Sequence, residues 1–194
     1  MARHSTLVCQ VCRLRPFPGA TGPSLFISAE LIWREQGPFI LSYGLLPDPS
    51  FDRRSLSDQL SGPWDQPRNV GSRRDQLWQH TCFEAFLALP GQQVYWELNV
   101  SPSGDWNLYR FSGYRQGGEP EPNAVAPSVS LQRVARGLRC TIELDPSGFW
   151  PSSLVPEIAL TTVLEQRDGP LSYWALSHPG EQADFHDRRS FLTL

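Results

Sequence analysis

The stretch that decides the fold runs from Leu77 to Phe111 and reads LWQHTCFEAFLALPGQQVYWELNVSPSGDWNLYRF. Side chains of a strand alternate between its two faces, so the apolar even-numbered residues of 94–100 share one face and the odd-numbered residues, Glu97 and Asn99 among them, share the other. Pro90-Gly91 and the sequence Ser-Pro-Ser-Gly at 101–104 are typical of tight turns. The stretch therefore predicts adjacent antiparallel strands joined by short turns, with the middle strand half-buried.

The same stretch carries polar side chains among large aromatic ones. If residues 78–86 are extended, the even positions place an imidazole, a thiol and a carboxylate on one face with two aromatic rings. Polar groups on such a face usually need partners. Two interpretations stay open: a ligand platform with hydrogen bonds from Glu84, Glu97, Asn99 and Arg110, or a core in which the acids pair with arginines of neighbouring strands.

Segments at the centre and the end of the chain resemble a known group of domains. Residues 77–86, with Leu77-Trp78 followed by Cys-Phe-Glu-Ala-Phe, and residues 95–104, Tyr-Trp-Glu-Leu-Asn-Val-Ser-Pro-Ser-Gly, are similar to the paired-strand signature of DOMON-like domains. The resemblance is to the small bacterial type, related to family 9 carbohydrate-binding modules. The ending Tyr-Trp-Ala-Leu-Ser-His-Pro at 173–179 with Asp-Phe-His at 184–186 is similar to the close of these small bacterial members.

This resemblance implies a β-sandwich that binds a sugar or a haem group. Glu84 matches the Glu that follows the strand cysteine in the family motif, and Glu97 with Asn99 matches the polar side of the next strand. We therefore expect these three residues as polar contacts, with Trp78 and Trp106 as stacking rings and with His80 and Arg110 as further hydrogen-bond donors. The opposing hypothesis makes Glu84 a salt-bridge partner of Arg110 and thus a residue of stability.

Length and charge bound the class of protein. A chain of 194 residues suits one domain, and we expect residues 1–194 to form a single β-sandwich. The net charge is −3 and the isoelectric point is near 5.8, with the arginines scattered, so nucleic-acid binding is not expected. All 17 basic residues are arginines, which excludes Schiff-base or lysine-nucleophile chemistry.

Cysteine usage and hydropathy bear on the compartment. Cys9 and Cys12 form a C-x-x-C without the second pair of a zinc ribbon, and residue 13 is Arg where haem attachment would need His. Alternation around them favours an edge strand in which they act as small hydrophobic residues. No window approaches the about 20 apolar residues of a membrane span, and the first residues lack a secretory pattern. We expect a cytoplasmic protein.

The rest of the chain alternates between strand patterns and turns. Residues 24–46 predict a hairpin, and two further strand pairs are predicted at 128–135 with 138–144 and at 157–165 with 171–176. Residues 47–74 and 113–127 are predicted to be loops, and Trp64 in the first could either cover the platform or fill one end of the sandwich. With no long amphipathic pattern, the sequence predicts an all-β fold, a two-sheet antiparallel β-sandwich.

Three chemistries are alternatives to simple binding: a catalytic nucleophile, a metal site and a haem site. No strained G-x-S-x-G elbow occurs, and His80 with Cys82 would lie about 7 Å apart along a strand, too far for a catalytic pair. Asp184 and His186 are candidate metal ligands, because related carbohydrate modules often hold calcium. For haem, Met1 is the only methionine, which leaves His80, His178 and His186 as axial candidates.

The sequence thus predicts a non-catalytic domain that binds a sugar or a similar small polar ligand. Aromatic rings for stacking and planar hydrogen-bonding groups suit sugars. The alternatives are a haem-binding redox domain and a sandwich that binds a protein partner by strand addition at an exposed edge.

Overall fold

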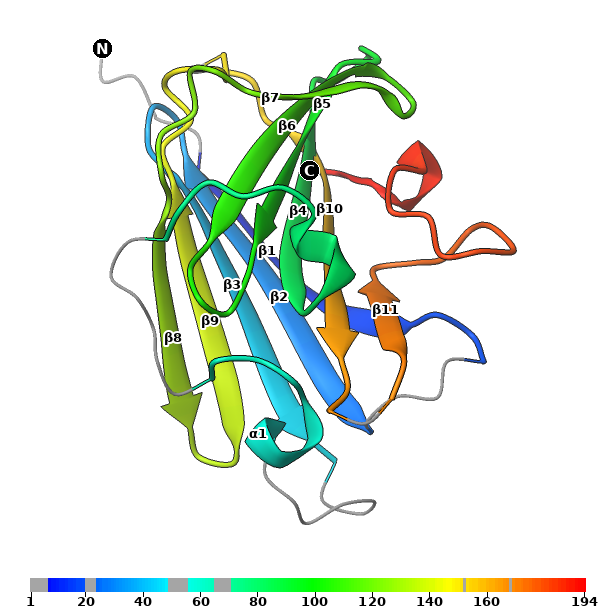
Figure 1. Cartoon of the computed structure of the whole chain (residues 1–194). Helices are drawn as coiled ribbons and strands as arrows, with labels where there is room; N and C mark the ends of the chain where they lie inside the picture. The colour runs from blue at the N-terminus through cyan, green and yellow to red at the C-terminus, as the bar shows by residue number, and fades with distance from the viewer. Residues whose placement is uncertain (1–6, 20–23, 49–55, 65–70, 152, 168) are drawn as a thin grey trace.

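The computed structural model describes residues 7–19, 24–48, 56–64, 71–151, 153–167 and 169–194. Strands dominate these ranges, and helical structure is confined to three short turns (Figure 1). The turns are α1 (Leu56–Gln59), η1 (Leu77–Gln79) and η2 (Arg188–Ser190). No helix within the described part of the chain is long and apolar enough to span a membrane.

The first sheet contains five antiparallel strands in the order β1-β2-β3-β9-β8. The expected hairpins of residues 24–46 and 128–144 are both confirmed, because β2 pairs with β3 and β8 pairs with β9. The bounds of the strands are β1 (Leu7–Pro16), β2 (Leu25–Arg34), β3 (Phe39–Pro47), β8 (Ser128–Val134) and β9 (Gly137–Leu144).

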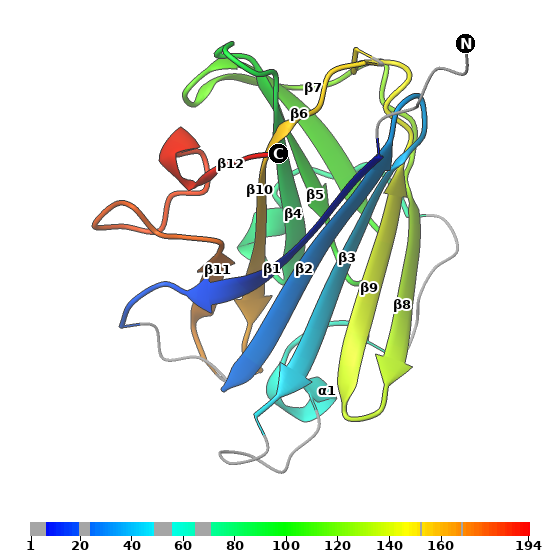
Figure 2. The same cartoon turned by 180° about the vertical axis from the view of Figure 1, so that it is seen from behind.

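The second sheet packs against the first and has the order β7-β6-β5-β4-β10-β11, with β12 beside β10 (Figure 2). It contains the central stretch of the sequence in β4, β5 and β6, which pair in antiparallel register as predicted. The bounds are β4 (Cys82–Ala88), β5 (Tyr95–Val100), β6 (Trp106–Gly113), β7 (Gln116–Pro120), β10 (Glu157–Glu165), β11 (Leu171–Ala175) and β12 (Leu192–Thr193).

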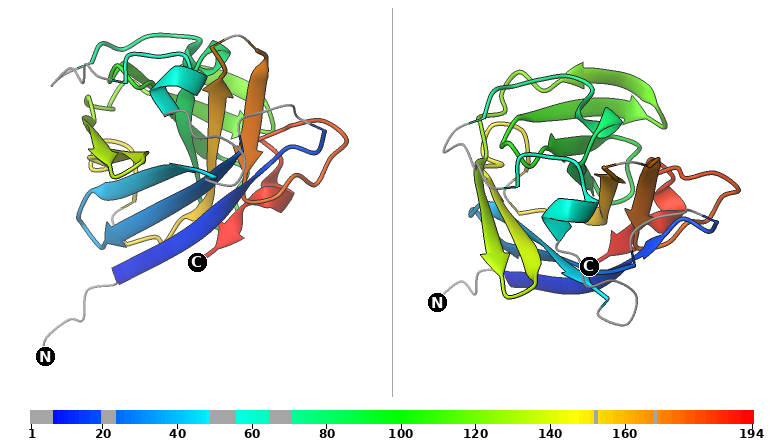
Figure 3. Two further views of the ribbon diagram at one scale, coloured as in Figure 1. Left: turned by 90° about the horizontal axis from the view of Figure 1, so that it is seen from below. Right: turned by 60° about the horizontal axis from the view of Figure 1, so that its bottom comes forward.

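Strand β1 belongs to both sheets. Its residues 7–14 pair with β2, and then Arg15 and Pro16 pair with Ala175 and Trp174 of β11. The views in Figures 2 and 3 show β1 passing from one layer to the other at this side of the molecule. Backbone hydrogen bonds thus join the two sheets along one side of the β-sandwich. The edge strands at the two ends of the strand order are β7 and β8.

The main core fills the space between the sheets. Alternation in β5 is as predicted, since Trp96, Leu98 and Val100 belong to this core and Tyr95 points to the other face. Tyr43 of β3 crosses the core, and its phenol Oη donates a hydrogen bond to the carbonyl oxygen of Glu84 in β4. Trp64 is buried in the core with its indole N–H on the Leu60 carbonyl oxygen at 3.2 Å, so it fills the sandwich rather than covering the platform.

Three local expectations from the sequence are wrong. Residues 77–79 form a 3₁₀ turn rather than strand, because Gln76 adopts a left-handed φ of 61° and redirects the chain before β4 begins. The expected loop 113–127 contains strand β7. Strand β5 is buried on both faces rather than half-buried, since a C-terminal segment covers its outer side.

The segment 71–75 is fixed to the loop before β6. Its backbone exchanges hydrogen bonds with Trp106, from Arg74 N to the Trp106 carbonyl at 2.9 Å and from Trp106 N to the Ser72 carbonyl at 3.0 Å. Gly71 permits this approach, because a Cβ atom there would lie 1.7 Å from the carbonyl oxygen of Gly104. The close backbone contact at Gly71 therefore sets the position of η1 over the second sheet.

Replacing Gly71 with alanine should lower the free energy of unfolding by about 1–3 kcal/mol, since backbone atoms must move to admit the methyl group. Chemical denaturation measures this change. Gly180→Ala is the matched control, because its Cβ would be in ordinary van der Waals contact with the Gln182 backbone, at 3.5 Å from the oxygen and 3.9 Å from the nitrogen. Equal stability of the two variants would show that the 71–75 segment is not held as described.

Candidate functional site

The outer face of the second sheet is covered by the end of the chain. Aromatic and small side chains of β4, β5, β6 and β10 form a second apolar cluster there, and Phe185 and Phe191 pack onto it. In Figures 1 and 2 the C-terminal segment lies outside the β10 and β11 strands. The cover removes from water a sheet face that the sequence pattern alone leaves exposed.

Two glutamates lie under this cover on neighbouring strands. Glu84 of β4 is 2% exposed and Glu97 of β5 is 6% exposed. Asn99 donates to Glu97 Oε1 at 2.8 Å, and Thr161 of β10 donates to Glu84 Oε2 at 3.3 Å. The strand register places Glu84 opposite Asn99, so the two carboxylates are diagonal neighbours on one face.

Burial dominates the electrostatics of this acid pair. Desolvation, followed by repulsion from Glu97, raises the pKa of Glu84 well above its ordinary value. Desolvation raises the pKa of Glu97 to about 7, although the Asn99 hydrogen bond and the Arg115 charge both act to lower it. The acid pair therefore keeps a proton at a pH where an exposed carboxylate is fully ionised.

His186 reaches the same place from the C-terminal segment. Its Nε2 lies 3.6 Å from Glu97 Oε2, and its Nδ1 is 2.8 Å from the Tyr95 hydroxyl. Desolvation, with the nearby Arg115 charge, lowers the pKa of His186 to about 4, so the imidazole is neutral near pH 7. Tyr95 Oη accepts from the Arg115 backbone N–H at 3.2 Å and can give its own proton to Nδ1, which leaves the Nε2–H directed toward Glu97.

Asp184 ties the C-terminal segment to the β6–β7 turn. Arg115 Nη2 lies 2.8 Å from Asp184 Oδ1, and the Tyr114 hydroxyl donates to Asp184 Oδ2. Partial burial disfavours the charged carboxylate, but the hydrogen bonds from Tyr114 and Arg115 outweigh it and lower the pKa of Asp184. The backbone N–H of His186 also donates to Asp184 Oδ1 at 3.1 Å, which makes residues 184–186 a pinned turn.

These groups surround an open pocket of about 360 Å³, which we call the acid-pair pocket. Its floor is the polar pair on β4 and β5, and its walls are mostly aromatic. Trp78, at 40% exposed, stands at the rim, with its ring 5.8 Å from that of Tyr109 in an edge-on contact. The lining residues are Trp78, Glu84, Phe86, Glu97, Phe111, Arg115, Val163, Tyr173, Ala183, Phe185 and His186.

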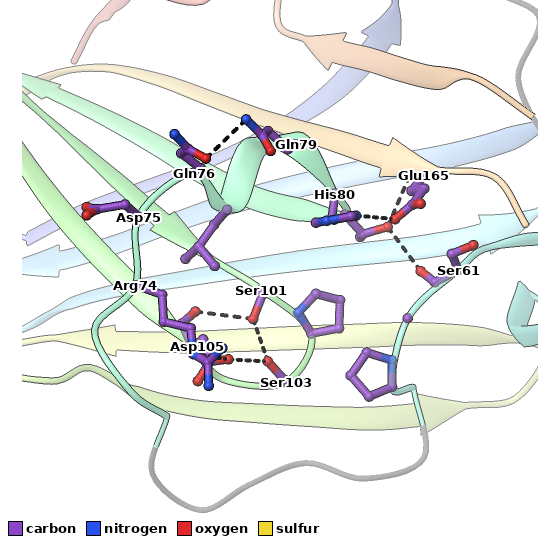
Figure 4. A pocket seen from close by; sticks show the side chains of 15 residues that line it. Ser61, Arg74, Asp75, Gln76, Gln79, His80, Ser101, Ser103, Asp105 and Glu165 are labelled. Carbon is purple, nitrogen blue, oxygen red and sulfur yellow. Dashed lines mark hydrogen bonds and ion pairs between the residues drawn. The ribbon is translucent and has the colours of Figure 1, made fainter.

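A second pocket of about 440 Å³ lies beside the loops 61–63, 74–81 and 101–105 (Figure 4). His80 Nδ1 is 2.9 Å from Glu165 Oε2, and Ser103 donates to Asp105 Oδ2 at 3.1 Å. Figure 4 shows the His80–Glu165 and Ser103–Asp105 contacts as two separate groups on the pocket wall. This second pocket lacks the aromatic walls of the acid-pair pocket.

The structure brings together part of the residue set predicted from the sequence. Trp78, Glu84 and Glu97 line the acid-pair pocket, and Asn99 lies beneath it in contact with Glu97. His80 does not join them, because η1 turns it away from the β4 face and into the second pocket.

Two other predicted residues lie on the opposite side of the sheet. Trp106 is a buried member of the core between the sheets and is not available as a stacking ring for this pocket. Arg110 is exposed with its guanidinium 5.8 Å from the Trp96 ring centre, also toward the core side. The hypothesis that Glu84 forms a salt bridge with Arg110 is therefore wrong, since the two side chains lie on opposite faces of the sheet.

The candidate metal and haem ligands are occupied by protein partners. Asp184 and His186 are engaged with Arg115 and Tyr95, and the described residues contain no group of three His, Cys, Asp or Glu side chains that could hold a metal. Each of the two pockets contains one histidine, while His178 Nε2 lies 3.0 Å from the Arg15 carbonyl oxygen. Neither the calcium nor the haem hypothesis gains support from these positions.

The sequence reasoning missed the residues that the tertiary fold supplies to the pocket. Arg115 lies in a turn after the predicted strand, and nothing in the sequence indicates its positive φ of 52°. Tyr173 and Phe185 come from near the end of the chain, where the pattern shows only that aromatic residues occur. The one available signal was the family resemblance at 173–179 and 184–186, which marked both segments without assigning them a role.

A comparison with known structures supports the fold. No family model matches this chain, and no curated protein matches it in sequence. The chain is similar in structure to a putative carbohydrate-binding protein from Bacteroides uniformis, with a TM-score of 0.59 and 9% sequence identity, over 94% of this chain and 84% of that one. At this identity the likeness shows the β-sandwich fold alone, and membership of the DOMON-like group stays a prediction.

The acid pair predicts how stability varies with pH. A carboxyl group whose pKa is raised on folding stabilises the protein fully below its unfolded value near 4.5 and loses that contribution as pH rises through about 7. Replacing Glu97 with glutamine, which keeps a neutral acceptor for Asn99, should remove this loss. The variant should gain on the order of 2–3 kcal/mol relative to the native chain between pH 4.5 and pH 8.

The native protein and the Glu97→Gln variant must be compared at each pH, because the pH dependence of stability that His186 contributes has the opposite sign. Its lowered pKa makes its contribution fall as pH drops from about 6.5 to about 4, which offsets part of the glutamate effect in the native chain. Urea unfolding at several pH values measures the difference. Glu84→Gln should shift in the same direction, and a difference that does not grow with pH for either variant would contradict the buried acid pair.

Proposed function

We propose that this protein is a non-catalytic domain that binds a sugar or a similar small polar ligand in the acid-pair pocket. The observation that carries this proposal is the combination of buried planar acceptors, Glu84 and Glu97, with an exposed indole ring at the rim, Trp78. Sugars present hydroxyl donors around an apolar ring face, so they fit a site that offers acceptors beside an aromatic surface.

The pocket is also prepared for binding by its supporting contacts. Asp75 Oδ1 accepts from both Asn107 and Tyr109 at 2.8 Å, which fixes the segment that carries Trp78 over the outer face of the sheet. Asn99 holds the Glu97 carboxylate in place from below. Side chains held in this way lose little conformational freedom when a ligand binds.

Two further considerations agree with this function class. The resemblance to DOMON-like domains and family 9 carbohydrate-binding modules implies binding of a sugar or of haem, and the structural neighbour is described as a putative carbohydrate-binding protein. In the proposed site, Glu84, Glu97 and Trp78 contact the ligand, Arg115 and His186 border it, and Asn99 positions Glu97.

A glycan array followed by fluorescence titration of the sugars that bind tests the proposal. Trp78→Ala should weaken binding about five- to thirtyfold, since loss of ring stacking costs about 1–2 kcal/mol. Trp78→Phe should retain part of the affinity because a smaller ring remains.

His80→Ala is the control, because His80 belongs to the second pocket. Affinity that is lost in His80→Ala and kept in Trp78→Ala would move the binding site to the second pocket. Absence of any carbohydrate ligand on the array would contradict the proposed sugar class.

A further inference from the structure

The floor of the acid-pair pocket contains an acceptor without a matching donor. Glu84 Oε1 is buried and accepts no hydrogen bond, a condition that it shares among the described residues only with Trp33 Nε1 in the core. The other oxygen of the same carboxyl group accepts from Thr161. A buried acceptor left unpaired is costly, so a donor from a ligand would be strongly favoured at this point.

The donors of the pocket are already engaged elsewhere. Arg115 pairs with Asp184, and the donor of His186, its Nε2–H, is directed toward Glu97 rather than toward Glu84. The neighbouring Cys82 thiol lies 3.6 Å from Asn99 Oδ1 and also interacts with Glu84, but a thiol is too weak a donor to satisfy a buried carboxylate oxygen. The group missing from the site is therefore a strong donor rather than an acceptor or an anion.

The charges and walls of the pocket also favour a cation. Three carboxyl groups, Glu84, Glu97 and Asp184, stand near one guanidinium, that of Arg115, which is committed to Asp184. Aromatic side chains form much of the wall. An ammonium group beside carboxylates and aromatic rings gains charge-assisted hydrogen bonds and cation–π attraction.

We infer that the acid-pair pocket binds the protonated primary amine of a small cyclic ligand, with the amine donating to Glu84 Oε1 and Glu97 and the ring lying against Trp78. This inference rests on the proposed function and narrows its ligand class to amino sugars and related cyclic amines. The amine supplies the donor that Glu84 lacks, and its positive charge favours release of the proton that the buried acid pair holds. A neutral sugar supplies the donor without the charge.

Calorimetric titration of the full chain with two matched pairs of probes tests this inference. The pairs are glucosamine with glucose, and cyclohexylamine with cyclohexanol, so that each amine is compared with a neutral molecule of the same ring size. Each amine should bind at least about tenfold more tightly than its neutral counterpart. In Glu84→Gln the ratio should fall toward one, whereas Glu165→Gln, in the second pocket, should leave it unchanged.

The outcomes separate this inference from the proposed function. If glucose binds as tightly as glucosamine, the amine inference is overturned while sugar binding stands. If cyclohexylamine is preferred over cyclohexanol and neither sugar binds, the amine site stands and the sugar class is overturned. If neither amine is preferred, or if Glu84→Gln keeps the preference, the inference is overturned.

Discussion

The removal of the second sheet's outer face from water is the constraint on which the site depends. Sheets of a β-sandwich normally bury one face and leave the other to solvent, and this chain follows that rule only for its first sheet. On the second sheet, Phe185 and Phe191 return from the end of the chain and cover β4 and β5. Glu84 and Glu97 are acidic residues at positions where an uncovered sheet would keep them hydrated and ionised, so their unusual proton affinity follows from the cover.

The core between the sheets holds this arrangement from below. The Tyr43 hydroxyl reaches from β3 to the backbone of Glu84, so the first sheet contacts the strand that carries the acid pair. Strand β1 hydrogen bonds to both sheets and links them. The floor of the pocket is thus supported by the sandwich, while its rim is formed by the short η1 turn and by the C-terminal segment.

Much of the fold could be predicted from the sequence, because period-two alternation reports directly on strands. The pairing of β4, β5 and β6 and the face of Trp96 both followed from it. The η1 turn could not be predicted, since it depends on a left-handed Gln76, a residue type with no marked preference for that conformation. Strand β7 could not be predicted, because its glycines and its proline are typical of loops.

The candidate site was predictable only in its local part. Glu84 and Glu97 stand out in the sequence as acidic residues among apolar and aromatic ones, but that they share a face follows only from the register of β4 and β5. The partners that complete the pocket lie far away in sequence, such as His186, which contacts Tyr95 across 91 residues. Alternation along one strand carries no information about such contacts. For the same reason the sequence predicts Trp106 and Arg110 as ligand contacts together with Glu84 and Glu97, although the sheet separates them.

The long separation between floor and cover has a consequence for the synthesis of the protein. The strands of the floor leave the ribosome some eighty residues before the segment that covers them, so β4 and β5 first meet solvent with their glutamates ionised and hydrated. The pocket is complete only when residues 183–191 dock, and the burial that results raises the pKa of both glutamates. Completion of the site is therefore a late step, distinct from the formation of the sandwich beneath it.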